Sequence, residues 1–302
     1  MDIQNKIDME TYKDGNLNKD VKAGEKSRIE EEKLDAEKIL TTIENRSLDN
    51  YFNSGSGLKD AQKVFGQTEE EIEKEFKNYK ARKMFGRMDY LLINNTLSIE
   101  EIKKECEIAV HYGFKSVTVL PSMLKFAKNA VSGSNITVRA LISYPFGEDV
   151  FEIKRKACKI AVKNGADAIA VTLSTSAIKN GEVKNLAKEV LKISKMARKK
   201  KVTVIIDTSK LNPIELKNTA IAIADECKVY SILPSSLFIP EKPQISTIKE
   251  VIKAVDGKCF IESGGNLATA EETVSILSLG ASTVTSQKCP LIAKDALKKL
   301  NA

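Results

Sequence analysis

The sequence is poor in the residues that build metal sites and hydrolytic triads. One histidine, His111, occurs among 302 residues, so neither a histidine-rich metal site nor an ordinary Ser-His-Asp triad can be assembled. We expect His111 in the last turn of a helix. The five cysteines lie far apart, without a Cys-x-x-Cys pair and in or beside apolar segments, which predicts buried, reduced thiols. We therefore expect neither a metal nor a cofactor.

Long hydrophobic runs are also missing. No uncharged apolar stretch approaches the ~18 residues that a membrane span needs. The first residues, MDIQNKIDMETYKDG, lack the apolar core of a secretory signal, so we expect a cytoplasmic protein without membrane contact. The net charge of +7 lies on lysine-rich helix faces such as ARKKK, without interleaved aromatic residues. A positive charge could attract phosphorylated small molecules or nucleic acid. The pattern favours a solvated lysine-rich surface as the explanation, and we expect no nucleic-acid partner.

The pattern of apolar and polar residues changes near residue 86. Residues 1–28 are polar and aperiodic, which predicts a disordered lead-in. Residues 29–85 carry apolar side chains at nearly helical spacing, interrupted by the linker NSGSG, and predict a helical N-terminal extension. Its second helix begins after Thr68, with acids in the first turn and lysines later, as the helix dipole prefers. We expect homo-oligomer contacts through these helices or through the remaining domain.

Residues 86–302 alternate between short apolar, β-branched segments and amphipathic stretches. The expected strands are 88–93, 115–121, 136–143, 167–174, 202–209, 228–235, 258–263 and 281–286. Examples of the intervening helices are 99–110, 150–163, 183–199 and 213–226. Eight such units predict an α/β fold, a (β/α)8 TIM barrel. A doubly wound open sheet is the alternative, which is less favoured because there is no Gly-x-Gly-x-x-Gly motif.

Active sites of such barrels lie at the C-terminal ends of the strands. The residues expected there are Asp89, Thr118, Ser143, Ser174, Asp207, Ser231, Glu262, Ser263, Gly264, Gly265, Ser286, Gln287 and Lys288. Three are acid–base candidates, namely Asp89, Asp207 and Glu262, although Asp89 and Glu262 have a structural role as an equal alternative because strand side chains alternate in direction. Phosphate-binding candidates follow strands 7 and 8, at Ser263, Gly264, Gly265, Ser286 and Lys288. For the two glycines, a tight turn is the alternative.

The ordered run of segments over 86–302 resembles the deoxyribose-phosphate aldolase family. The opening MDYLLINNTLSIEEIKKE, the third-strand segment LISYPFGED, VKNGADAIAVTLSTSAIKNGE, VTVIIDTSKL, FIESGGN and LGASTVTSQK follow that family in order and spacing, with Tyr144 replacing a phenylalanine. The resemblance implies a carbon–carbon lyase that forms a Schiff base through a lysine on strand 6. It also implies a second lysine on strand 7 that lowers the pKa of the first, and an aspartate on strand 4.

The sequence departs from this pattern at all three positions. Tyr230, or Ser231 after a one-residue shift, stands at the strand 6 lysine, Ile261 at the strand 7 lysine and Ala170 at the aspartate. None of these side chains can form an imine, and none carries a charge that would lower the pKa of a neighbouring amine. We therefore expect a phosphorylated sugar or similar metabolite to bind while ordinary Schiff-base cleavage is lost or replaced.

Two alternatives stay open. One is an active aldolase with a relocated lysine, for which Lys179, Lys210, Lys242 and Lys288 lie in loops of the expected active face. Of these, Lys179 matches a lysine present in ordinary members, and Lys288 is better interpreted as a phosphate counter-charge. The other alternative is a non-catalytic binding or scaffold barrel.

Overall fold

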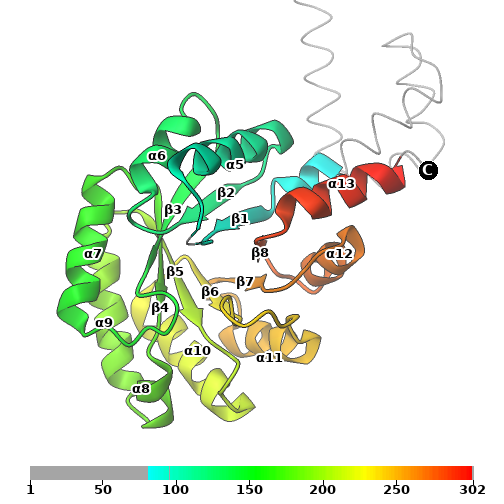
Figure 1. Ribbon diagram of the computed structural model, residues 1–302. Helices are drawn as coiled ribbons and strands as arrows, with labels where there is room; N and C mark the ends of the chain where they lie inside the picture. Colours follow the sequence, from blue (N-terminus) through cyan, green and yellow to red (C-terminus); the bar gives the residue numbers. More distant parts are fainter. Residues whose placement is uncertain (1–80, 95, 301–302) are drawn as a thin grey trace, which may run out of the picture. The chain divides into compact units, whose positions relative to one another are not determined.

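Eight parallel strands close into a barrel in chain order, as predicted (Figure 1). They are β1 Met88–Leu92, β2 Ser116–Val119, β3 Thr137–Ile142, β4 Ala168–Thr172, β5 Lys201–Ile206, β6 Ser231–Pro234, β7 Phe260–Gly264 and β8 Thr283–Ser286. Closure is direct, because Asp89 of β1 pairs with Thr285 of β8 on one side and with Ser116 of β2 on the other. The open-sheet alternative is therefore excluded.

The computed structural model describes residues 81–94 and 96–300, which lie in one compact unit, Lys74–Ala302. The predicted lead-in, the linker and most of the predicted N-terminal helices lie outside the described residues. The described end of that extension, 81–85, is helical. Its Phe85 is 2% exposed and packs edge-on against Tyr112 and Phe114, so this short segment belongs to the barrel core.

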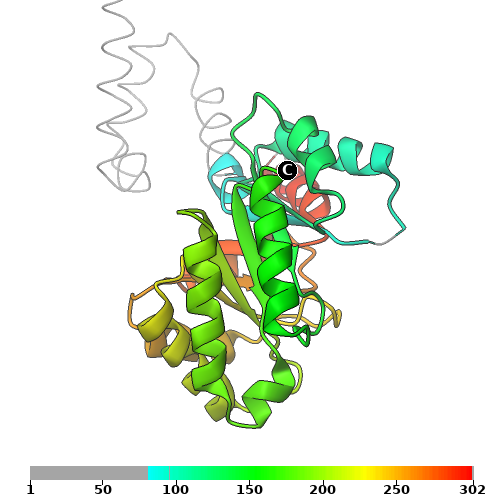
Figure 2. The same cartoon turned by 90° about the vertical axis from the view of Figure 1, so that its left-hand side faces the viewer.

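Helices cover the outside of the barrel. They are α5 Ile99–Tyr112, α6 Leu124–Ala130, α7 Phe151–Lys163, α8 Thr175–Lys179, α9 Val183–Met196, α10 Pro213–Cys227, α11 Ile245–Val255, α12 Ala270–Ser278 and α13 Cys289–Leu300. In Figure 2, α7 and α9 lie side by side across the strands. None of the helices that the structure describes is both long and apolar enough to cross a membrane.

Local sequence signals set the helix ends. Capping boxes begin α5 at Ser98, α10 at Asn212 and α12 at Thr269. The side chains of these residues accept hydrogen bonds from free backbone amides of the first turn. Helix α5 ends at Gly113 in the left-handed conformation, with His111 in its last turn as predicted. Helix α9 ends earlier than predicted, because Arg198 and Lys199 take positive φ angles of 50° and 69°.

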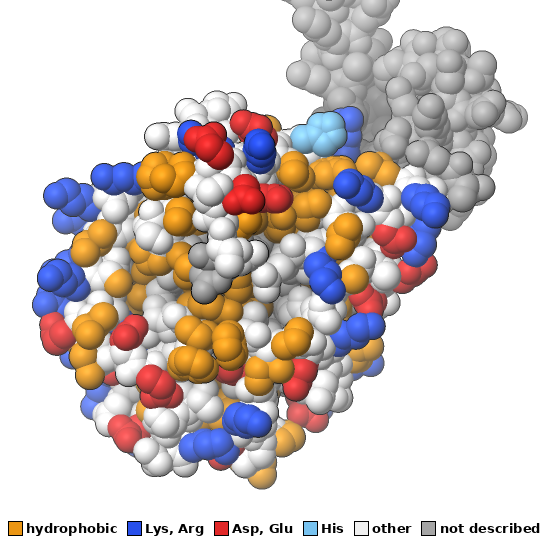
Figure 3. Space-filling view, viewed as in Figure 1, with side chains coloured by type: hydrophobic (Ala, Val, Ile, Leu, Met, Phe, Trp, Pro, Cys, Tyr) orange, Lys and Arg blue, Asp and Glu red, His pale blue; other side chains and the backbone are white. Residues whose placement is uncertain are grey.

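Side chains along each strand point alternately toward the helices and into the barrel, and so form two separate hydrophobic cores. Side chains such as Tyr90 and Leu92 of β1 join the large core between barrel and helices. The residue between them, Leu91, belongs to a second cluster inside the barrel. On the face in Figure 3, hydrophobic side chains gather toward the middle and charged ones mainly toward the edge.

Candidate active site

The barrel interior contains an apolar layer near the C-terminal ends of the strands. This layer, called the apolar layer below, consists of Leu91, Leu141, Ala170, Ile205, Leu233 and Leu237. Five of its members come from strands, whereas Leu237 comes from the loop between β6 and α11. Side chains of Ile93, Leu120 and Tyr144 pack against it. The floor of the barrel mouth is therefore hydrophobic.

A polar layer lies beneath the apolar layer, one inward position closer to the N-terminal end of each strand. Its centre is Arg139 of β3, which is 5% exposed. The guanidinium donates to Asp89 Oδ2 at 2.6 Å and to Glu262 Oε2 at 2.8 Å. It also donates to three threonine hydroxyls, those of Thr118 at 2.8 Å, Thr203 at 3.0 Å and Thr285 at 3.3 Å. All five donors of the fork thus face acceptors from five different strands.

Electrostatics keep Glu262 ionised inside the barrel. Burial alone would raise its pKa, but the charge of Arg139 and hydrogen bonds from Ser231 and Arg139 outweigh burial and lower the pKa. Burial alone would lower the pKa of Arg139, but the negative charges of Asp89 and Glu262 outweigh burial and raise it. Lys115, just before β2, donates to Thr283 at the N-terminal end and adds positive charge near Glu262. The cluster is a buried, hydrogen-bonded ion network.

Two of the three acid–base candidates belong to this network. Asp89 and Glu262 are 0% and 1% exposed and lie below the apolar layer, away from the mouth. Their geometry favours the structural alternative for both. Asp207 lies apart from them, directly after β5, where it is half-buried and its Oδ1 accepts from the Ser209 amide at 2.9 Å. Burial and the nearby charge of Asp207 raise the pKa of Tyr144 to about 12.

The positions of the expected Schiff-base residues are spread along the barrel. Ala170 lies in the apolar layer. Tyr230 precedes β6 at its N-terminal end, where Lys201 Nζ lies 4.6 Å from its ring and Phe260 packs beside it. Ile261 faces the helices, because it belongs to the outer core. Ser231 is in the polar layer, where it donates to Glu262 Oε1 at 2.6 Å.

The strand 6 side chain that shares the apolar layer with Ala170 is Leu233. Tyr230 and Ser231 lie outside this layer. Sequence reasoning missed this residue, because a short apolar strand does not reveal its own register. Leucine cannot form an imine either, so the expected absence of lysine at this site does not depend on the alignment.

A buried lysine and the lysines expected in loops of the active face lie outside the barrel interior. The fully buried one, Lys154, lies on α7 with its Nζ 3.7 Å from Glu189 of α9. Lys179 and Lys242 are exposed and pair with Glu215 at 3.8 Å and Glu272 at 2.5 Å. Lys210 is exposed after β5. Lys288 differs from these because it is half-buried beside the barrel mouth.

A cavity of about 320 Å³ opens at the barrel mouth and is called the mouth cavity below. Its lining residues are Leu91, Leu237, Phe238, Ile239, Pro240, Gly265, Asn266, Gln287 and Lys288. Lys288 is the one charged residue in this lining, and no carboxylate shares it. Such a cavity favours an anion.

The predicted phosphate-binding residues only partly meet at this cavity. Gly265 and Lys288 line it, whereas Ser263, Gly264 and Ser286 do not. The Gly264 amide donates to Ser235 Oγ at 3.0 Å, and the Gly265 amide donates to the Thr285 carbonyl at 3.2 Å. The Ser286 hydroxyl donates to the Leu267 carbonyl and accepts from the Lys288 amide. In this conformation, side chains rather than these amides are available to a ligand.

Close packing explains the glycine pair. Gly265 has a φ of +129°, and a Cβ there would lie 2.6 Å from the Glu241 carbonyl oxygen. A Cβ on Gly264 would lie 2.9 Å from the Thr285 carbonyl oxygen and 3.0 Å from the Leu237 side chain. The glycines let the β6–α11 loop fold tightly over β7 and bring Leu237 into the apolar layer.

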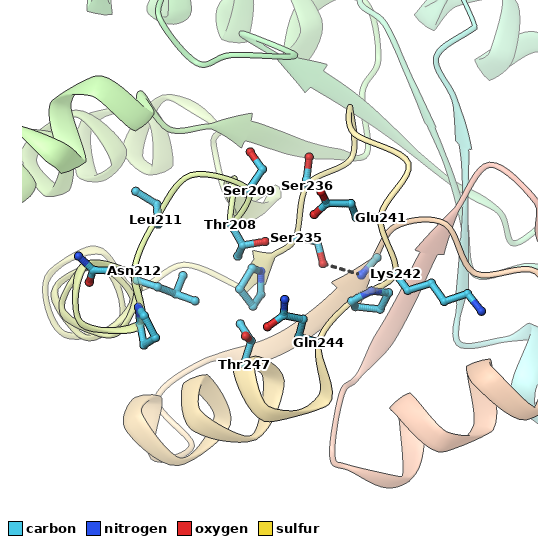
Figure 4. Close-up of a pocket in the computed structure, with 15 residues that line it drawn as sticks. Thr208, Ser209, Leu211, Asn212, Ser235, Ser236, Glu241, Lys242, Gln244 and Thr247 are labelled. Atoms are coloured by element: carbon cyan, nitrogen blue, oxygen red, sulfur yellow. Dashed lines mark hydrogen bonds between the residues drawn. The ribbon is translucent and has the colours of Figure 1, made fainter.

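A second cavity of about 260 Å³ lies between the β5–α10 and β6–α11 loops (Figure 4). Its wall carries the hydroxyls of Thr208, Ser209, Ser235, Ser236 and Thr247, with Gln244 nearby. Lys242 also lines it but is paired with Glu272, whose pKa is lowered to about 2 by hydrogen bonds from the Ala268 amide and Lys242. This hydroxyl-lined cavity was not predicted from the sequence.

Comparison with known structures supports the fold. The aldolase QR15 has a TM-score of 0.68 at 23% identity, covering 72% of this chain and 96% of that one. The tetrameric deoxyribose phosphate aldolase of Aeropyrum pernix has a TM-score of 0.67 at 15% identity, covering 76% and 98%. At these identities the likeness establishes the barrel fold alone.

Comparison with curated sequences establishes the family. No protein-family model matches the chain. The deoxyribose-phosphate aldolase of Mycoplasmoides pirum is 29% identical over 214 residues, which cover 70% of this chain and 96% of that protein. The deoxyribose-phosphate aldolase of Malacoplasma penetrans is 30% identical over 203 residues, which cover 67% of this chain and 91% of that protein. Together with the closed barrel, this similarity shows that the chain belongs to the deoxyribose-phosphate aldolase family.

Proposed function

We propose that the mouth cavity binds a phosphorylated sugar or a similar phosphorylated metabolite, and that ordinary Schiff-base aldol cleavage is lost or replaced. The observation that carries the proposal is the charge of the lining, one lysine and no carboxylate. Lys288 supplies the positive charge, and Gln287 supplies an amide group beside it. A phosphate group needs such donors and a net positive surrounding.

Lost or replaced imine chemistry follows from the residues around Ala170. A Schiff base needs an amine there, and the apolar layer offers only hydrocarbon side chains. The neighbouring cation in the polar layer is a guanidinium, which stays protonated and hydrogen-bonded to Asp89 and Glu262. The network therefore stabilises charge inside the barrel without supplying a nucleophile.

An active aldolase that uses Lys288 is the second candidate. It is favoured by one observation, the half-buried position of this lysine at the mouth cavity. The proposal and this candidate differ in one measurable product, a covalent imine. Asp207, beside the mouth, is the acid–base residue that we propose for any reaction there.

Borohydride reduction separates the two candidates. The full-length protein is incubated with acetaldehyde or deoxyribose 5-phosphate and treated with borohydride. Its mass is then measured by mass spectrometry. We expect no adduct, together with thermal stabilisation by deoxyribose 5-phosphate and none by unphosphorylated deoxyribose. At ten times Kd the stabilisation corresponds to about 1.4 kcal/mol. An adduct that maps to Lys288 and disappears in Lys288→Arg would instead establish the second candidate.

Assembly is a separate proposal. We expect a homo-oligomer, and the tetramer named for the Aeropyrum pernix protein makes this a reasonable expectation. Truncation should remove 1–80 and keep 81–85, because Phe85 is part of the barrel core. If light scattering gives the same number of subunits for the truncated and the full-length protein, residues 1–80 have no role in assembly. The cytoplasmic location stays a prediction.

A further inference from the structure

The mouth cavity has two unlike walls. One wall carries Gln287 and Lys288, which follow β8. A second, apolar wall is formed by the β6–α11 loop through Leu237, Ile239 and Pro240, and Leu91 of β1 adds to the apolar lining. A ligand that fills this cavity must therefore place an anionic group against one wall and its body against hydrocarbon.

The apolar wall continues into the barrel. Leu91 and Leu237 are 3% and 8% exposed, and both belong to the apolar layer together with Leu233. A sugar hydroxyl placed on this surface would give up its hydrogen bonds to water without gaining a partner. A hydrocarbon body would instead release water from the surface.

Polar groups near the wall are already engaged. The Tyr144 hydroxyl points to the Leu237 carbonyl at 3.4 Å, and Asn266 Nδ2 donates to the Pro240 carbonyl at 3.2 Å. Among the lining residues, Gln287 and Lys288 are the polar ones whose side chains form no hydrogen bond with another described residue. These two side chains suffice for one anionic group but not for several sugar hydroxyls as well.

The rim of the cavity is apolar too. Phe238 of the cavity wall packs edge-on against Phe146 of the β3–α7 loop, with ring centroids 5.4 Å apart. The two residues are 56% and 58% exposed. An aromatic pair left in solvent at an entrance is suited to contact the apolar part of an entering molecule.

We infer that the ligand of the mouth cavity is a phosphate monoester with an apolar body rather than a polyhydroxylated sugar phosphate. The inference rests on the proposed function, because it takes phosphate binding at Lys288 as given. It specifies the substrate class: the phosphate lies at Gln287 and Lys288, and the carbon chain lies along Leu237 and Ile239.

Isothermal titration calorimetry of the full-length protein tests this inference with two ligands of equal carbon number. Pentyl phosphate and 2-deoxyribose 5-phosphate share the phosphate and a five-carbon body, and differ in the hydroxyls and the ring. We expect pentyl phosphate to bind at least tenfold more tightly. Ile239→Ser should reduce this preference at least threefold, whereas Val274→Ser, at a half-exposed site on α12, should leave it unchanged.

The outcomes separate this inference from the proposed function. If deoxyribose 5-phosphate binds as tightly as pentyl phosphate and Lys288→Gln weakens both tenfold, the proposed function stands and the apolar-body inference is overturned. If Lys288→Gln changes neither affinity, or if neither ligand binds the wild-type protein, both are overturned. Binding of deoxyribose 5-phosphate that is lost in Ser209→Ala would move the site to the hydroxyl-lined cavity and would also overturn the inference.

Discussion

Arg139 of β3 reaches across the barrel and donates to Glu262 of β7, with Nη1 and Oε2 2.8 Å apart. The same guanidinium binds Asp89 of β1 through Nη2. One side chain thus connects three strands that are not neighbours in the sheet. Because the pairing needs all three partners at fixed heights, it sets the relative register of these strands inside the barrel.

Removing the guanidinium should destabilise the protein strongly. Arg139→Met leaves Asp89 and Glu262 buried without the guanidinium that now neutralises them. We expect a loss of about 3–5 kcal/mol in the free energy of unfolding, the usual cost of breaking a buried pair from one side. Urea denaturation followed by circular dichroism measures it. Arg155→Met is the matched control, because Arg155 pairs with Glu152 at the surface, and should cost at most about 1 kcal/mol.

Stability should fall in acid through Glu262. The folded-state pKa of this group lies below its ordinary value of 4.5, so its contribution is present above about pH 4.5 and is lost as the pH falls through the folded pKa. We expect the unfolding free energy of the wild-type protein to decrease in that range. Glu262→Gln should be less stable at pH 7 and should show a shallower decrease in acid. An identical slope in both proteins would contradict this assignment.

Gly265 should not tolerate a side chain. Alanine there combines an unfavourable positive φ with a Cβ 2.6 Å from the Glu241 carbonyl oxygen. We expect Gly265→Ala to cost about 3 kcal/mol or more, from backbone strain and overpacking together. Gly257 also has a positive φ, of +73°, but no atom within 4 Å of its Cβ position. Gly257→Ala should therefore cost only about 1–2 kcal/mol, and equal losses in thermal melts would refute the role of Glu241.

The five cysteines should react slowly in the folded protein. All are free thiols, and four are buried while Cys259 is partly exposed. Burial raises the pKa of Cys106 and Cys227 to about 12 and that of Cys158 and Cys259 to about 11. We expect a thiol reagent at pH 8 to modify Cys259 first and the rest only after denaturation. Fast labelling that persists in Cys259→Ser would contradict this order.

The barrel was predictable because its signals are local. Short β-branched runs, helix caps and glycine helix ends each depend on a few neighbouring residues, and all eight expected strands occur. Helix ends were less certain, as α9 shows. Nothing in the sequence marks Arg198 and Lys199 as left-handed residues, because both are ordinary helix formers.

The interior was less predictable because alternation gives two faces but not their direction. Asp89 and Glu262 were therefore recognised as polar residues on strands, whereas their position below the apolar layer was not. One signal was available, Arg139 within the otherwise uncharged segment ITVRALIS. A charged residue in a strand covered on both faces needs a buried counterion. The apolar wall of the mouth cavity depends on how the β6–α11 loop folds, which no local pattern encodes.

The apolar layer has a consequence for how this chain can change. An amine introduced by Leu233→Lys would stand beside Ala170 among Leu91, Leu141 and Ile205, and such desolvation favours the neutral, nucleophilic form of lysine. The apolar layer would therefore lower the pKa of a lysine placed in it. A single substitution could supply a neutral amine for imine formation, because the surroundings that make an amine reactive are already in place.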